Sequence, residues 1–218
     1  MVAALAVNEH HQSLGEEIAN SISHGLGLLA AAIAVPLLVV TAVRRGDATS
    51  VVGVSVFAAA MVLLYLTSML YHALPRTRAK RLFHVLDHSA IFLMIAGTYT
   101  PFTLGVVRGG WGWTLFGLVW GLAVIGITVK AIGGPRRHPR LSVGLYVAMG
   151  WLIVIAVQPL RLHMPATGLL WLVAGGIAYT AGVAFYAAKR LPYGHLIWHL
   201  FVLAGTTCHF VAVWRYAT

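Results

Sequence analysis

Two histidines near the end of the 218-residue sequence have the spacing of a metal-binding pair. His195 and His199 lie four residues apart in HLIWH, so on an α-helix both imidazoles project from one face. Taken alone, such a pair also fits two histidines that form hydrogen bonds between helices. His72 offers a third imidazole, and three histidines with a fourth position left for water form a catalytic zinc site. The three histidines are therefore candidate zinc ligands.

Asp87 is the one carboxylate that falls inside a long apolar stretch. The other four acidic residues lie in the tail or in a loop: Glu9, Glu16, Glu17 and Asp47. A carboxylate is costly to bury in such a stretch, which makes Asp87 a candidate catalytic residue. Ser68 precedes His72 by four residues and shares its helical face, where the hydroxyl could orient His72 or contact a substrate. A bond from Ser68 to the carbonyl of Leu64 is the alternative.

A polar stripe leads into the first apolar stretch. Glu17, Asn20 and His24 are three and four residues apart, so they share one helical face and are candidates to surround and orient the metal ligands. For Glu17 the alternative is a solvated first helical turn, where acidic residues are also favoured.

A rival pair of histidines brackets Asp87. His84 and His88 are also four residues apart, and either could replace His72 as a ligand. His84 lies three residues from Arg81 and is expected at the membrane boundary, whereas His88 is deeper and could orient a ligand.

The elements that carry these residues are apolar enough to require a bilayer. Hydrophobic residues make up 60% of the sequence, charged residues 9%, and the mean hydropathy is +0.85. The formal charge of +10 resides in short loops and not on a basic face alternating with aromatic residues, so a nucleic-acid partner is not expected. Cys208 is the only cysteine, which excludes an internal disulfide and a thiolate cluster.

The sequence predicts an all-α, polytopic membrane protein with seven transmembrane helices. The expected spans are 21–43, 50–72, 84–106, 111–131, 141–160, 167–188 and 194–214. We expect residues 1–218 to form one domain: a cytoplasmic tail and amphipathic lead-in (1–20), a membrane bundle (21–214) and an external C-terminus (215–218).

The distribution of basic residues predicts the orientation. One side of the spans carries ten Lys and Arg residues: Arg76, Arg78, Lys80, Arg81, Lys130, Arg136, Arg137, Arg140, Lys189 and Arg190. The other side carries five, so the positive-inside rule places the N-terminus in the cytoplasm. Helical rise then places His24, His72, Asp87 and His195 within about 6 to 10 Å of the cytoplasmic boundary, in one layer. His209 lies about 15 Å along the helix from His199, too far to join them.

Glycines in two spans predict close packing of helices. Gly117 and Gly121 form a small-xxx-small pair, and Gly175 and Gly176 are adjacent in the sixth span.

With these residues in place, the sequence resembles the bacterial hemolysin III proteins, which belong to the progestin and adipoQ receptor family with the adiponectin receptors. The resemblance covers almost the whole chain and rests on three motifs: EEIANSISH with Glu17, Asn20 and His24, SMLYH followed by LDH, and HLIWH. The runs AGTYTPF and AGTTCHF are also similar to the bacterial branch. The resemblance implies a seven-helix bundle with a cytoplasmic N-terminus. It further implies that His72, His195 and His199 hold zinc and that Asp87 holds a water molecule there.

The function that this resemblance implies is a zinc-dependent hydrolase of membrane lipids, with ceramide-type amides as the substrate class. In that interpretation Asp87 accepts a proton and Ser68 steadies the oxyanion. Two alternatives stay open: a sensor or regulator of membrane lipid state with structural zinc, and a pore-forming hemolysin. The expected location is the cell membrane, as a multi-pass protein of the bacterial inner membrane.

Overall fold

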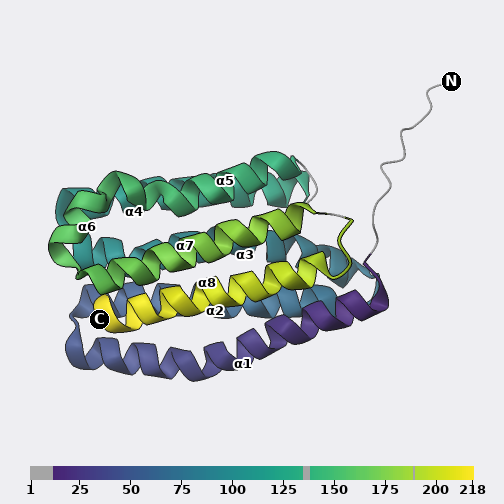
Figure 1. The fold of residues 1–218 in the computed structure, drawn as a ribbon, viewed down its shortest axis with the longest axis horizontal. Coiled ribbons are helices and arrows are strands. Elements are labelled where there is room, and N and C mark those ends of the chain that lie inside the picture. Colours follow the sequence, from purple (N-terminus) through teal and green to yellow (C-terminus); the bar gives the residue numbers. More distant parts are fainter. Residues whose placement is uncertain (1–11, 135–137, 189) are drawn as a thin grey trace.

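Seven helices long and apolar enough to cross a membrane lie side by side in one bundle, which confirms the predicted fold class (Figure 1). The computed structural model describes residues 12–134, 138–188 and 190–218. The seven spans are α1 (Leu14–Arg45), α2 (Ala48–Ala73), α3 (Arg78–Pro101) with the π-helical η1 (Phe102–Val107), α4 (Gly109–Gly133), α5 (Pro139–Trp151) with η2 (Leu152–Ala156) and α6 (Val157–His163), α7 (Ala166–Ala187) and α8 (Gly194–Tyr216). Most of the predicted tail, and Arg136, Arg137 and Lys189 of the orientation argument, lie outside the described residues.

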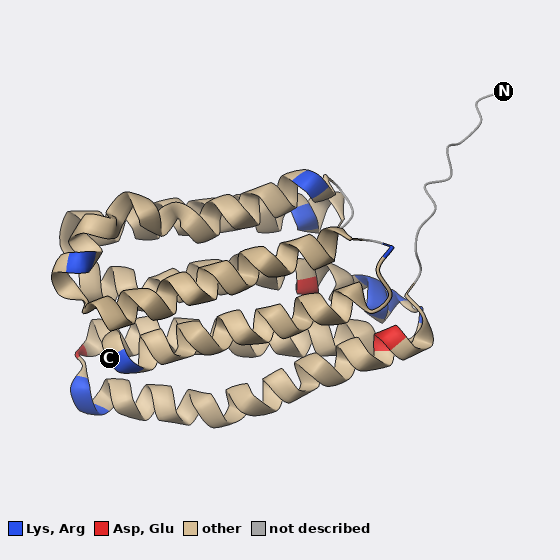
Figure 2. Cartoon of the chain, in the orientation of Figure 1, with Lys and Arg blue, Asp and Glu red and all other residues tan. Residues whose placement is uncertain are grey.

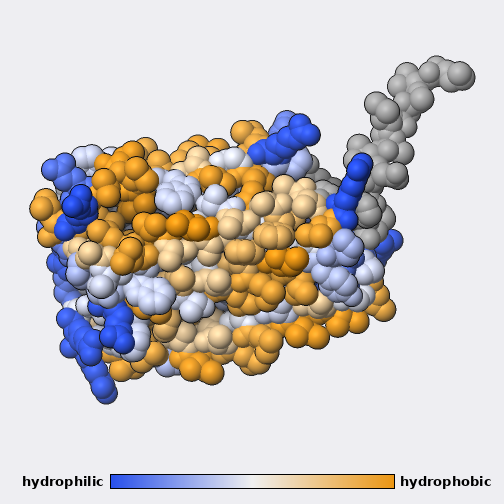
Figure 3. Space-filling view, viewed as in Figure 1, coloured by the Kyte–Doolittle hydropathy of each residue, from blue (hydrophilic) through white to orange (hydrophobic). Residues whose placement is uncertain are grey.

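The surface of the bundle matches a lipid environment. Charged positions gather toward its two ends (Figure 2), and the space-filling view shows apolar side chains over the band between them (Figure 3). Ile33, Ile132 and Leu170 are 77%, 80% and 67% exposed in the isolated chain. So many large apolar side chains facing outward are stable only where lipid covers them.

The lead-in to the first span is part of helix α1. Ser13 caps the helix by accepting from the backbone N–H of Glu16 (3.2 Å), while its own N–H donates to the Glu16 carboxylate (2.8 Å). The same carboxylate accepts from the backbone N–H of Tyr193 (2.9 Å), just before α8 begins. These bonds join the start of α1 to the start of α8, so the polar stripe of α1 lies beside the HLIWH segment.

The fifth span is not the uninterrupted helix that the prediction of 141–160 implied. A 3₁₀ segment, η2, separates α5 from α6, because Pro159 has no N–H to donate to the carbonyl of Ile155. Tyr99 of α3 fills the break: its hydroxyl donates to the carbonyl of Met149 (2.9 Å) and accepts from the N–H of Ile153 (2.8 Å).

The glycine predictions had two outcomes. A Cβ added at Gly175 would collide with the ring of His209, so α7 and α8 do pack closely there. A Cβ at Gly117 or Gly121 would meet nothing within 4 Å, and both glycines are exposed. The prediction for α4 was therefore wrong, because a pair of small residues does not reveal which face of a helix meets a neighbour.

Candidate metal centre

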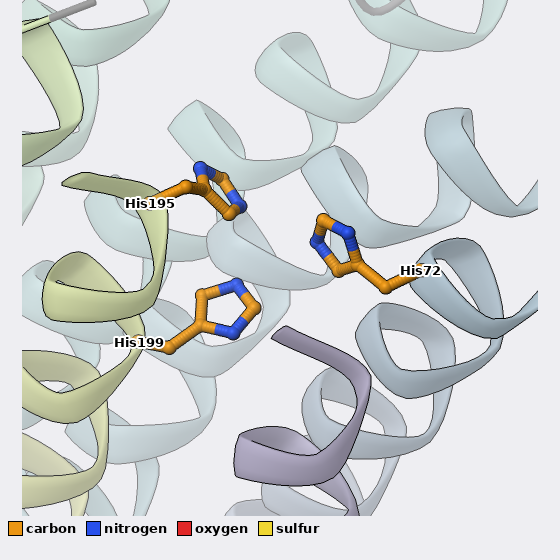
Figure 4. Close-up of side chains that lie close together, drawn as sticks. All are labelled: His72, His195 and His199. Carbon is orange, nitrogen blue, oxygen red and sulfur yellow. The ribbon is translucent and has the colours of Figure 1, made fainter. Parts of the chain in front are cut away.

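Three histidines from two helices face one another at one end of the bundle (Figure 4). His195 and His199 project from one face of α8, and His72 projects from the last turn of α2. Each offers one ligand nitrogen, and these atoms all lie within 4.8 Å of one another. A tetrahedral zinc site with Zn–N bonds of 2.0–2.1 Å needs its nitrogens roughly 3.4 Å apart. Small side-chain rotations therefore suffice for these residues to hold a metal ion.

The outer nitrogen of His72 is fixed by a carboxylate. Nδ1 of His72 lies 2.7 Å from Oε2 of Glu17, and since a carboxylate only accepts, Nδ1 carries the proton and donates it. In the neutral ring Nε2 then carries the lone pair, and this atom is buried without a hydrogen-bond partner. A histidine held by a carboxylate on one nitrogen and open on the other has the arrangement of a metal ligand.

His199 is oriented in the same way by a hydroxyl. The hydroxyl of Ser23 donates to the carbonyl of Asn20 (2.8 Å), which uses its only proton. Nδ1 of His199, 2.9 Å from that hydroxyl oxygen, must then donate to it. The lone pair of His199 is consequently on Nε2, so two of the three imidazoles are in the tautomer that binds metal through Nε2.

Glu17 and Asn20 lie where the polar stripe predicted, and Glu17 is not a solvated residue of a first turn. The Glu17 side chain is 22% exposed, and its second oxygen accepts from Nζ of Lys80 (2.9 Å). Asn20 is fully buried and donates to the side chain of Gln12 (3.0 Å). The stripe therefore joins α1 to the ends of α2 and α3 around the histidines.

His24 lies against the ligands but cannot share their metal ion. Its ring stacks on that of His199 with centroids 3.6 Å apart and an angle of 8° between the planes. A histidine lone pair lies in the plane of its ring, so an ion in the plane of one stacked ring is too far from the plane of the other. His24 is thus a buried neighbour of the centre, with both ring nitrogens unpaired.

Asp87 and Ser68 line the cavity into which the centre opens. Asp87 is 8% exposed, and both His72 and the hydroxyl of Ser68 lie close enough to interact with it electrostatically. His88 lies 3.5 Å from the Asp87 carboxylate and donates from Nδ1 to the carbonyl of His84 (3.1 Å). The ring of His84 stacks on Tyr71 with centroids 4.5 Å apart.

The geometry favours His72 over its rivals as the third ligand. Across the described stretches of the chain, the one cluster of three close metal-ligating side chains is that of His72, His195 and His199. His84 and His88 instead form a second pair, with ring centroids 4.7 Å apart, and His88 lies beside Asp87.

The cavity is mainly apolar and runs deep into the bundle. It has a volume of about 130 Å³ and is partly open to the outside. Its walls include Asp87 to Tyr99 of α3 and His195 to His209 of α8, which correspond to roughly 18 and 21 Å of helical rise. The histidines and Asp87 therefore stand at one end of a long, mainly apolar space, whose polarity suits a lipid chain.

Two residues of the centre were not assigned from the sequence. Ser23 lies three residues after Asn20, a spacing that could have indicated its place on the polar stripe. Lys80 reaches Glu17 from the start of α3, 63 residues away, and no spacing in the sequence relates the two.

Comparisons with known proteins agree on one family. Residues 12–210 match a family model described as "Haemolysin-III related". The chain is 45% identical over 205 residues to "Hemolysin-3" of Bacillus cereus, covering 94% of this chain and 93% of that protein. It is 43% identical over 204 residues to "Hemolysin-3 homolog" of Bacillus subtilis (94% and 95% covered). It is 26% identical over 163 residues to the human "Monocyte to macrophage differentiation factor" (70% and 65% covered).

Proposed function

This chain belongs to the haemolysin-III-related family of multi-pass membrane proteins, and from that premise we propose that it is a zinc-dependent hydrolase of membrane lipids, acting on amides of the ceramide type. One observation carries the proposal: three histidines that face one another stand beside a buried carboxylate at the end of a long apolar cavity. In two of them, His72 and His199, Nδ1 is held by a hydrogen bond.

The donor set fits zinc. Three imidazole nitrogens and no thiolate suit that ion, and three protein ligands leave a fourth position open. The buried, unpaired Nε2 of His72 is the atom that a metal ion would satisfy. Zinc held by His72, His195 and His199 would supply a Lewis acid for the scissile carbonyl and an acidified water as the nucleophile.

The protein's own groups account for the proton transfers. In amide hydrolysis the water oxygen bonds to the carbonyl carbon, the C–N bond breaks, and one proton moves from the water to the leaving nitrogen. Asp87, which lines the cavity, would accept that proton and return it to the nitrogen. Ser68, which lines the same cavity, would donate a hydrogen bond to the carbonyl oxygen as negative charge develops there. The apolar cavity holds the acyl chain and excludes water from it.

The substitution Asp87→Asn tests the proposal. In lipid nanodiscs loaded with zinc, we expect release of fatty acid from ceramide to fall by about 10²- to 10⁴-fold, because the amide cannot accept the proton. Zinc content should stay at the wild-type level. The control is Asp47→Asn, since Asp47 pairs with Arg108 (2.7 Å) away from the cavity that holds the histidines. Unchanged turnover in Asp87→Asn would remove Asp87 from the mechanism.

The names of two relatives favour a lytic or pore-forming activity as a second candidate. Conductance across a planar bilayer with purified protein would support it.

A third candidate is a sensor of membrane lipid state with structural zinc. It requires a fourth protein ligand on the metal, and X-ray absorption spectroscopy of the zinc-loaded protein distinguishes such a closed site from an open one.

A further inference from the structure

One face of α8 lines the cavity over four helical turns. His195, His199, Val202 and His209 all contribute to the cavity wall, and their spacings of four, three and seven residues repeat on one side of a helix. The same face that carries two candidate metal ligands at one end therefore carries a third histidine at the other. The proposed function does not use His209.

The bonds of His209 leave one nitrogen without a partner. Nε2 lies 3.2 Å from the carbonyl oxygen of Leu172 on α7, and since a carbonyl only accepts, Nε2 carries the proton of the neutral ring. Nδ1 is then an acceptor, and it is buried without a hydrogen-bond partner. Gly175 packs directly against the ring and leaves no room for a side chain there.

The other polar groups at this end of the cavity are already paired. The Tyr99 hydroxyl is used at the break in the fifth span, the Tyr179 hydroxyl bonds Thr206 (2.7 Å), and the indole N–H of Trp151 donates to Thr180 (3.0 Å). Among the described residues, the buried side-chain atoms without a partner belong to Asn20, His24, His72 and His209. Of these residues, His24 and His209 line the cavity, His24 at the end with the histidine cluster and His209 at the other, so a nitrogen without a partner lies at each end.

We propose that His209 is a specificity-determining residue that accepts a hydrogen bond from a hydroxyl group part-way along the chain of the bound lipid. The polar end of such a lipid lies at the histidine centre, and its chain runs along α8 toward Nδ1. The helical rise from His199 to His209 is about 15 Å, close to the reach of about twelve carbons of an extended chain. A buried acceptor without a partner is costly, so a donor supplied at that distance stabilises the complex.

This inference rests on the proposed function in one respect, the binding of a lipid chain in the cavity. The test is displacement of tritiated palmitic acid from the purified, zinc-loaded protein in nanodiscs. The competitors are octadecanoic acid, its 12-hydroxy and 12-oxo derivatives, and its 2-hydroxy derivative, which places the hydroxyl at the metal end instead.

We expect the 12-hydroxy acid to compete about five- to tenfold better than octadecanoic acid, the gain of one buried hydrogen bond. The 12-oxo acid should show no gain, because its keto oxygen only accepts hydrogen bonds and cannot donate one to Nδ1 of His209. In His209→Phe the preference for the 12-hydroxy acid over octadecanoic acid should disappear, so that the two acids compete equally with each other. His163→Phe, an exposed histidine outside the cavity wall, should keep the preference.

Equal competition by the 12-hydroxy and unsubstituted acids, or a preference that survives in His209→Phe, would overturn the inference. The comparison of competitors in the wild type needs no variant, so the result holds even if His209→Phe folds poorly. Failure of every acid to compete would instead contradict lipid binding in the cavity, and with it the proposed function.

Discussion

Replacing Glu17 by glutamine should weaken metal binding without touching a metal ligand. Glu17 accepts from Nδ1 of His72 at 2.7 Å and from Nζ of Lys80 at 2.9 Å, which fixes the tautomer and direction of the His72 ring. A neutral amide accepts a weaker hydrogen bond than a carboxylate and can also turn its NH₂ group toward the ring. Loss of such an outer contact typically lowers metal affinity by about 10- to 100-fold, or about 1.4 to 2.7 kcal/mol.

The neighbouring residue provides a matched control. Glu16 carries the same charge on the same turn, but its carboxylate bonds the backbone N–H groups of Ser13 and Tyr193. Glu16→Gln should therefore lower thermal stability and leave zinc affinity unchanged. The assay is competition between the purified protein and a zinc-chelating dye. Two results would refute the role of the Glu17–His72 bond: a zinc affinity of Glu17→Gln within about twofold of the wild type, or an equal loss of affinity in Glu16→Gln. A twofold change and the smallest expected change, about tenfold, differ by about one kcal/mol, which the assay can resolve.

Two further predictions concern stability and are measured by thermal melting in detergent. Gly175→Ala should destabilise the bundle by about 1 to 3 kcal/mol because the new methyl overlaps a ring, while Gly117→Ala should change stability by no more than about 0.5 kcal/mol; equal melting temperatures would contradict this. The hydroxyl of Thr49, with Arg108 nearby, holds the pKa of Asp47 below its usual value, because each favours the charged carboxylate. In the unfolded chain the pKa of this carboxyl is about 3.9, so at pH values above about 3.9 the charged Asp47 contributes fully to the stability of the fold. This contribution is lost as the pH falls through the lower pKa of the folded protein. The melting temperature of the wild type should thus fall more on acidification than that of Asp47→Asn, and parallel curves would contradict the assignment.

Much of the bundle and of the cluster of three histidines could be predicted from the sequence. Continuous apolar stretches determine the spans, and the four-residue interval between His195 and His199 determines their common face. The depth of His72 relative to its flanking arginines placed it in the same layer, and the structure brings it to the other two histidines.

The remaining features depend on contacts between helices that no periodicity records. The pairing of Glu17 with Lys80 depends on where the start of α3 lies relative to α1. The exposed position of Gly117 depends on the rotation of α4 about its own axis. The break in the fifth span did have a local signal, Pro159, and the tyrosine that fills the break comes from another helix.

The central claim is tested most directly by the metal content of the purified protein, measured by plasma mass spectrometry. The comparison is between the wild type, His195→Ala/His199→Ala and His84→Ala/His88→Ala. We predict about one zinc per chain, lost in the first double variant and retained in the second, since three histidines form one site. A wild-type protein without metal after loading with zinc, or loss of zinc only in the His84→Ala/His88→Ala variant, would contradict the account.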